Sequence, residues 1–214
     1  SHPKGAPHLI DPAKLTAVAV YGEDTDWGHG VGEGLRGHFE AGGWNVVTET
    51  YFAFDQTDFT ASLQGLKDLQ PAVVAGTIGS AEGSAAFLNQ ADEVGLNSVI
   101  IAEGLGWTGD WYARTGSSSN YVVDQHPGWT NQAARAFRDN FEVRYGFEPS
   151  PSAGGMAYDA TNFLIGAMQE VYADHGDLTS DALYTFAQNE IWTGGWSYAD
   201  GIMMQNYEYA MDTI

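Results

Sequence analysis

The stretch TAVAVYGEDTDWGHGVGEGLRGHFEAGGWNVVTETY, residues 16–51, decides the fold. It opens on a continuous apolar run, Thr16–Tyr21, which is typical of a strand buried on both faces. Apolar residues then recur at helical spacing from Val31 until Gly42-Gly43 ends the predicted helix. Trp44–Tyr51 follows with the composition of a second strand. The stretch therefore predicts a strand–helix–strand unit.

The same alternation continues to residue 124. Further apolar runs predict three strands, at Pro71–Thr77, Asn97–Ala102 and Asn120–Asp124. Amphipathic segments predict two helices, one around Phe59, Leu63 and Leu66 with Thr57 or Asp58 as its cap, the other at Ala81–Val94. Buried strands that alternate with helices favour a doubly wound parallel sheet. We therefore predict an α/β lobe over residues 15–123, preceded by a tail or linker over residues 1–14.

The pattern changes after Asp124. Helical periodicity predicts two long helices and a shorter one, at Pro127–Tyr145, Ala153–Tyr172 and Ser180–Asn189. Because these three helices have no strands to cover, residues 124–190 predict the helices of a second, incomplete lobe. Aromatic residues in the final stretch, 191–214, surround Asp200-Gly201, which is a hairpin signal. We expect this hairpin to return to the first lobe.

Acidic residues dominate the charged composition. Asp and Glu number 28 against 8 Lys and Arg, which gives a formal net charge of −20. Such a surface repels phosphate backbones and anionic headgroups, so nucleic acid is not expected as a partner. A dense carboxylate shell is typical of salt adaptation, and we expect a halophilic source. The absence of cysteine excludes disulfides, thiolate catalysis and Cys-ligated zinc.

Motifs for cofactors and catalysis fail on their spacing. Four glycines occupy alternate positions from Gly28 to Gly34, but a dinucleotide fingerprint would need glycine where Glu33 or Leu35 stands. The acidic turn before them lacks the glycine and the glutamate of a calcium loop, and the histidines include no zinc-binding pair. We therefore expect no cofactor, no metal site and no enzymatic activity.

Four segments in order resemble the type 1 periplasmic binding proteins, the branched-chain amino acid and amide-binding group of ABC transporter receptors. The first is Val18–Tyr51 with its Trp27-Gly28 pair, followed by Thr57-Asp58-Phe59. The other three are LKDLQPAVVAGT (66–77), AAFLNQADEVGLNSVIIAEG (85–104) and RYGFEPSPSAGGMAYDATNFLIGAM (144–168). The resemblance covers most of residues 15–190. It implies two α/β lobes that close around a ligand, of which this chain is similar to the C-terminal portion.

The resemblance also implies a set of ligand-binding residues. Glu103 matches the acidic residue that amino-acid receptors place at a strand's carboxyl end to hold the ligand ammonium, although it also fits a solvated turn. Trp27 stands where the family commonly has a Tyr that contacts the ligand. Ser80 aligns near another binding position and also fits a helix N-cap. Trp107 lies close to Glu103 in the sequence, and Asp124 either faces the cleft from the expected hinge or caps the following helix.

The function that this resemblance implies is capture of a small polar solute, such as an amino acid, an amide or urea, for an ABC transporter. The expected partners are that small-molecule ligand and the transporter's membrane subunits. The expected location is periplasmic or extracellular, with a membrane anchor in an N-terminal segment that this chain lacks. Two other functions stay open: a carboxylate-dependent glycoside hydrolase, and a structural or assembly protein on a receptor-derived fold. For the latter, self-association or pairing with the missing N-terminal lobe would cover exposed edges.

Overall fold

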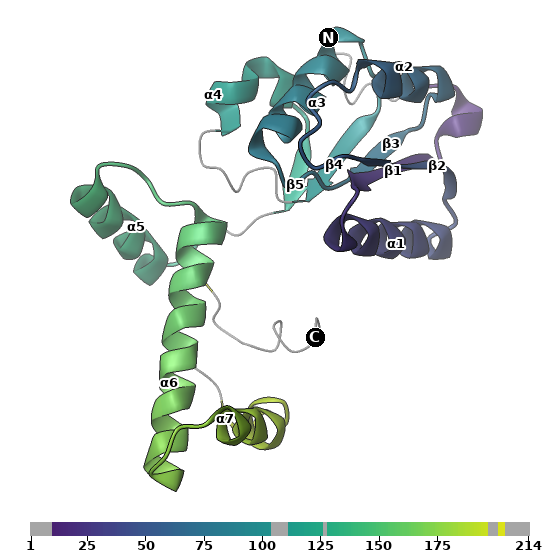
Figure 1. The fold of residues 1–214 in the computed structure, drawn as a ribbon. Helices are drawn as coiled ribbons and strands as arrows, with labels where there is room; N and C mark the ends of the chain where they lie inside the picture. Colours follow the sequence, from purple (N-terminus) through teal and green to yellow (C-terminus); the bar gives the residue numbers. More distant parts are fainter. Residues whose placement is uncertain (1–9, 104–110, 126–127, 197–200, 204–214) are drawn as a thin grey trace. The chain divides into compact units, whose positions relative to one another are not determined.

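The protein is described by a computed structural model that covers residues 10–103, 111–125, 128–196 and 201–203. The chain divides into two compact units, Ser1–His126 and Pro127–Ile214, each of which is described by itself. Figure 1 shows the sheet and its helices in the first unit, and the helices of the second.

The first unit is built on one parallel sheet of five strands in the order β2-β1-β3-β4-β5. The strands in chain order are β1 (Ala17–Glu23), β2 (Asn45–Phe52), β3 (Val73–Gly76), β4 (Val99–Glu103) and β5 (Val123–Gln125). Every residue of β1 is buried, as expected for a central strand covered on both faces. The predicted α/β lobe with a parallel sheet is confirmed.

Helices cover both faces of this sheet. They are α1 (Asp26–Ala41), α2 (Thr60–Leu69), α3 (Ala81–Glu93) and the short α4 (Trp111–Thr115), with 3-10 turns at Pro12–Lys14 and Gly116–Ser119. Figure 1 shows α1 on one face of the sheet, and α2 and α3 on the other. The core on the α2–α3 side contains Leu63, Phe87 and Leu88, whereas Leu35 and Phe39 of α1 pack against the core on the opposite side. Burial on both faces explains the apolar runs of the central strands β1 and β3.

Side-chain caps set where the helices begin. The Thr25 side chain accepts a hydrogen bond from the Gly28 amide at the start of α1, so this helix begins before the apolar residues that predicted it. Phe59 occupies the N-cap position of α2, not the predicted Thr57 or Asp58. The Asp58 carboxylate nevertheless accepts a hydrogen bond from the Thr60 amide over 3.1 Å, so it pairs the first amide of the helix. The Phe59 amide donates to Oε1 of Gln90 over 2.6 Å, so a side chain from α3 also holds the start of this helix.

The second unit contains helices and, among the residues described, no strand. Its elements are α5 (Gln132–Tyr145), a π-helical turn (Pro151–Met156), α6 (Ala157–His175), α7 (Ser180–Phe186) and a second π-helical turn (Ala187–Ile191). Gly146 and Gly176 end α5 and α6 in the left-handed conformation, with φ of 79° and 65°. Asn131 caps α5, so the alternative that Asp124 caps the following helix is wrong.

A buried carboxylate organises this second unit. Asp159 on α6 is fully buried and accepts hydrogen bonds from the amides of Ile202 (2.9 Å) and Met203 (2.6 Å). Asn131 donates to the Ile202 carbonyl over 2.7 Å, so the short described segment 201–203 is tied to both long helices. Most of the hairpin predicted over 191–214 falls on residues 197–200 and 204–214, which lie outside the described part of the chain.

We expect Phe87→Ala to lower the free energy of unfolding by about 3–5 kcal/mol. Phe87 is 1% exposed, and its ring contacts those of Tyr21, Phe52 and Phe59. Phe54→Ala is the matched control, because Phe54 is 56% exposed and its loss should change the free energy by less than about 0.5 kcal/mol. Chemical denaturation followed by circular dichroism measures both variants. Equal losses would contradict the core described above.

Candidate functional site

The strand order places a crevice at the carboxyl ends of β1 and β3. The chain passes from β1 to β2 on one side and continues through β3, β4 and β5 on the other, so the direction of winding reverses between β1 and β3. The helices that follow these two strands, α1 and α3, cover opposite faces of the sheet (Figure 1). Open α/β sheets bind ligands outside the carboxyl ends of their strands at such a switch point.

The buried carboxylate of Glu23 bridges this switch point. Glu23 ends β1 and is 6% exposed. Its Oε2 accepts a hydrogen bond from the Gly79 amide over 2.8 Å, and its Oε1 accepts one from the Thr25 hydroxyl over 3.1 Å. A Cβ at Gly79 would lie 2.9 Å from Oε2, so the glycine allows this approach. Glu23 therefore fixes the loop after β3 against the loop after β1.

Glu103 lies at the same edge, one strand further along. It is the last residue of β4 and is half-buried. The hydroxyl of the buried Thr77, directly after β3, lies 3.2 Å from both the backbone oxygen and Oε2 of Glu103 and can donate to either. This contact holds the carboxylate at the end of its strand instead of leaving it on a freely solvated turn.

The remaining predicted residues fall around this edge or outside the described chain. Trp27, in the first turn of α1, is 58% exposed. The Ser80 side chain accepts from the Gly83 amide over 3.2 Å and caps α3, which agrees with the N-cap interpretation and leaves its ligand role as a prediction. Asp124 lies on β5 and pairs in register with Ala102. Trp107 lies outside the described residues.

Two comparisons with known proteins agree with this geometry. The sequence matches the family described as periplasmic binding protein over residues 2–206. The chain belongs to the periplasmic binding protein family. The family predicted from the four segments is therefore confirmed, and its receptors bind solutes.

Solved structures of solute receptors share the fold of this periplasmic binding protein. A leucine binding protein from Thermotoga maritima matches with a TM-score of 0.68 and 20% identity, over 82% of this chain and 49% of that one. Another match is a branched-chain amino acid transporter substrate binding protein from Streptococcus pneumoniae, in complex with isoleucine. Its TM-score is 0.65 at 17% identity, and the match covers 92% of this chain and 55% of that one. A third match is a solute binding protein from Rhodopseudomonas palustris, in complex with benzoate. Its TM-score is 0.69 at 19% identity, and the match covers 94% of this chain and 56% of that one. The chain thus spans about half the length of these structures.

The alternating glycines of this periplasmic binding protein serve helix packing. A Cβ at Gly28 would lie 2.0 Å from the Glu23 carbonyl oxygen, and one at Gly32 would lie 2.2 Å from the Tyr51 hydroxyl, whereas Gly30 and Gly34 face open space. Two of the four therefore let α1 approach β1 and β2. The Tyr51 hydroxyl donates to Glu49. Burial, and to a smaller extent this hydrogen bond, raises the pKa of Tyr51 to about 12.

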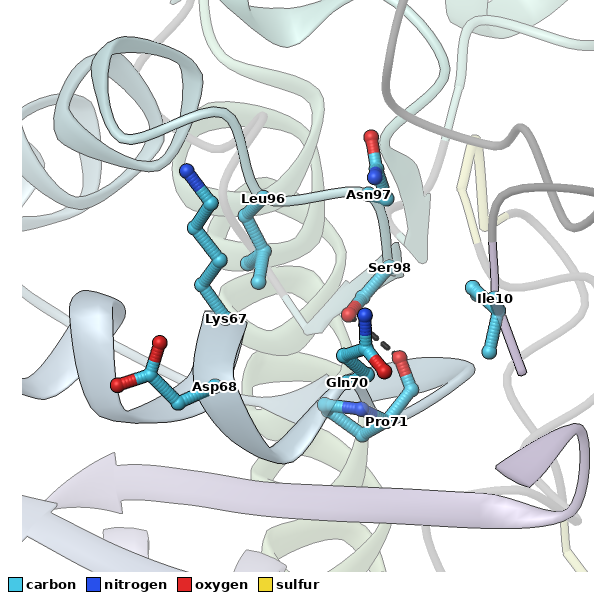
Figure 2. Close-up of a pocket in the computed structure, with 8 residues that line it drawn as sticks. All are labelled: Ile10, Lys67, Asp68, Gln70, Pro71, Leu96, Asn97 and Ser98. Atoms are coloured by element: carbon cyan, nitrogen blue, oxygen red, sulfur yellow. Dashed lines mark hydrogen bonds between the residues drawn. The ribbon is translucent and has the colours of Figure 1, made fainter. Parts of the chain in front are cut away.

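A separate hollow lies at the opposite edge of the sheet. It has a volume of about 410 Å³ and lies where β3 and β4 begin. Figure 2 shows the residues that line it: Ile10, Lys67, Asp68, Gln70, Pro71, Leu96, Asn97 and Ser98. Ser98 donates to the Pro71 carbonyl over 2.6 Å, and the Lys67 ammonium donates to the Val94 carbonyl over 2.6 Å. These polar groups hydrogen-bond to backbone carbonyls at the ends of helices and strands, so they are already used within the protein. The candidate site is therefore the carboxyl edge of the sheet.

Within the described residues, no group of three or more His, Cys, Asp or Glu side chains is placed to hold a metal ion. In the same residues, no helix combines the length and the apolar character needed to cross a membrane.

We expect Glu23→Gln to lower the free energy of unfolding by about 1–3 kcal/mol. The substitution places an amide NH₂ group in the position of one acceptor oxygen and removes the charge that strengthens the bond to the Gly79 amide. Glu93→Gln, at the exposed end of α3, is the control and should change the free energy by less than about 0.5 kcal/mol. Urea denaturation compares the two. If both variants unfold at the same urea concentration, Glu23 does not hold the switch point together.

Proposed function

We propose that the protein captures a small organic solute that carries an amino or amide nitrogen, and that it passes the solute to the membrane subunits of an ABC transporter. The observation that carries this proposal is the carboxylate of Glu103, held by Thr77 at the carboxyl edge beside the switch point. A carboxylate in this position forms charge-assisted hydrogen bonds with a ligand's N–H groups. Capture followed by lobe closure requires no bond to be made or broken.

The other charges at this edge favour a zwitterion. Helix α3 follows β3, the strand next to the one that ends at Glu103. The amino-terminal end of α3 carries the positive end of the helix dipole. A ligand carboxylate is stabilised there, while the ligand nitrogen is stabilised by Glu103. The exposed indole of Trp27 offers an apolar surface for the body of the ligand.

The solved relatives bring two ligand classes for comparison. The Streptococcus pneumoniae protein holds isoleucine, and the Rhodopseudomonas palustris protein holds benzoate. Both ligands carry a carboxylate, but only isoleucine carries an ammonium group. The carboxylate of Glu103 favours the first class, because an aromatic acid would place like charges near one another. Since family members act outside the cytoplasm, we also infer a periplasmic or extracellular location.

A second candidate function is an interaction with another polypeptide through α5 and α6. Val143 on α5 is 87% exposed and Leu164 on α6 is 52% exposed. The same two helices line a hollow of about 520 Å³ that includes Phe137 and Phe141. Exposed apolar side chains of this size favour a protein contact, including self-association. Sedimentation velocity tests this candidate. If the protein is a monomer at every concentration, self-association through these helices is excluded.

We expect isoleucine to raise the unfolding midpoint of the protein, and Glu103→Gln to weaken its binding by at least about tenfold. A ligand at 100 times its dissociation constant stabilises the folded state by about 2.7 kcal/mol. A thermal-shift series over isoleucine, leucine, urea, benzoate and 3,4-dihydroxybenzoate measures the effect, and calorimetry gives the affinities.

Glu40→Gln is the control, because Glu40 is exposed near the end of α1 and should leave every affinity unchanged. A midpoint raised by the aromatic acids alone, with Glu103→Gln without effect, would contradict capture of a nitrogenous solute.

A further inference from the structure

Helix α6 carries apolar side chains on two opposite sides. Ala167 and Val171 lie on its inner side and are buried. Tyr158, Ile165 and Tyr172 recur at every seventh position on its outer side, and they are 45%, 46% and 60% exposed. Because seven residues make about two helical turns, these three side chains form one stripe about 21 Å long. A helix that is apolar on both sides is typical of a position covered on both.

Helix α5 continues this apolar surface with a row of aromatic rings. The Phe137 ring lies 4.7 Å from that of Tyr158 and 5.9 Å from that of Phe141, measured between centroids. Tyr145 extends the row, with its centroid 4.4 Å from that of Phe141. These four rings line the hollow of about 520 Å³ on the two helices. We define the α5–α6 face as Phe137, Phe141, Tyr145, Tyr158, Ile165 and Tyr172.

Acidic side chains avoid the α5–α6 face, although the chain carries 28 of them. The acidic residues of α6 are Asp159, Glu170 and Asp174, and helical periodicity turns all three away from the outer stripe. The acidic residues of α5 are Asp139 and Glu142, which fall on the side away from the aromatic row. A solvated surface of so acidic a protein is expected to carry carboxylates. Their absence from the shared face of these two helices therefore indicates that the face is covered.

Arg144 is the one charged residue among those that line the hollow. Its guanidinium lies 5.3 Å from the centroid of the Tyr145 ring, and it forms no ion pair among the described residues. Arg138, on the same helix, is paired with Asp139 over 2.7 Å. An arginine without a carboxylate is unexpected in a protein with 28 acidic residues. A partner that presents a carboxylate to Arg144 would supply a charge-assisted hydrogen bond.

We propose that the α5–α6 face docks on the apolar face of a β-sheet supplied by polypeptide outside these 214 residues, with a carboxylate of that polypeptide on Arg144. The partner corresponds to the part of the receptor fold that this chain does not match. The solved relatives contain about as much chain again, since the match covers 49%, 55% and 56% of them. The described residues of the second unit include no strand. This inference deepens the second candidate function and does not depend on solute capture.

The dimensions and charge of the face favour a sheet over the other occupants. A small molecule fits the hollow, but the exposed stripe continues beyond it to Ile165 and Tyr172, which do not line it. The length of the stripe, about 21 Å, is close to that of a six-residue strand. Two neighbouring helices present a broad surface, as α2 and α3 do to the sheet of the first unit. A second copy of this chain would bring together two net charges of −20.

Single thiols report on whether the face is covered. The chain has no cysteine, so each substitution introduces one thiol. Ile165→Cys places it on the α5–α6 face, and Glu170→Cys is the matched control, because Glu170 is exposed on the same helix but turned away from the face. Both positions are exposed in the isolated chain, so both variants should keep its unfolding temperature and react with a maleimide at similar rates.

The experiment compares the isolated 214-residue chain with the receptor purified from its source cells. We expect the thiol at position 165 to react at least about tenfold more slowly in the purified receptor, because docking buries it. The thiol at position 170 should react at the same rate in both preparations. Arg144→Glu combined with Ile165→Cys should restore the fast rate, whereas Arg138→Glu should not, since Arg138 is paired within α5.

Equal rates at position 165 in the two preparations would overturn the proposal. Protection that grows with the concentration of the isolated chain would assign the face to a second copy, and protection of the isolated chain by benzoate would assign the hollow to a small molecule. Either result also contradicts the proposed sheet. If Arg144→Glu leaves the protection in place, the carboxylate on Arg144 is wrong. Calorimetry with isoleucine on the purified receptor is a separate readout, whose failure would contradict solute capture and leave the docking face untouched.

Discussion

The site depends on the carboxylate of Glu23, which joins two loops that are 56 residues apart in the chain. The sheet alone aligns β1 with β3 but leaves the loops beyond their carboxyl ends free to separate. By accepting from the Gly79 amide and the Thr25 hydroxyl, Glu23 fixes the start of α3 against the start of α1. The carboxylate is buried at a cost, and its hydrogen bonds offset that cost only while both loops stay in place. The positions of Trp27 and Ser80 on the two sides of the switch point follow from this one interaction.

Three carboxylates at the same edge have different surroundings, and these surroundings separate their roles. Glu23 is buried and has two donors from its own chain, which satisfies it internally. Glu103 is half-buried and shares the single Thr77 proton between its backbone and side-chain oxygens, so its carboxylate keeps capacity to accept from a ligand. Asp124 adds its charge from the next strand. In a chain with 28 acidic residues, the number of carboxylates carries no information about the site, but their burial and donors do.

The sequence was sufficient to predict the sheet, because its central strands are apolar runs and the helices between them have a 3.6-residue period. It also placed Glu103 at the carboxyl edge, since that residue directly follows the run Val99–Ala102. At the start of α2, Asp58 was correctly placed near the first amides, but the contact from Gln90 on another helix could not be predicted from the local sequence. The role of Glu23 was missed for a related reason. It depends on strand register and on Gly79 in another segment, which a local pattern does not reveal.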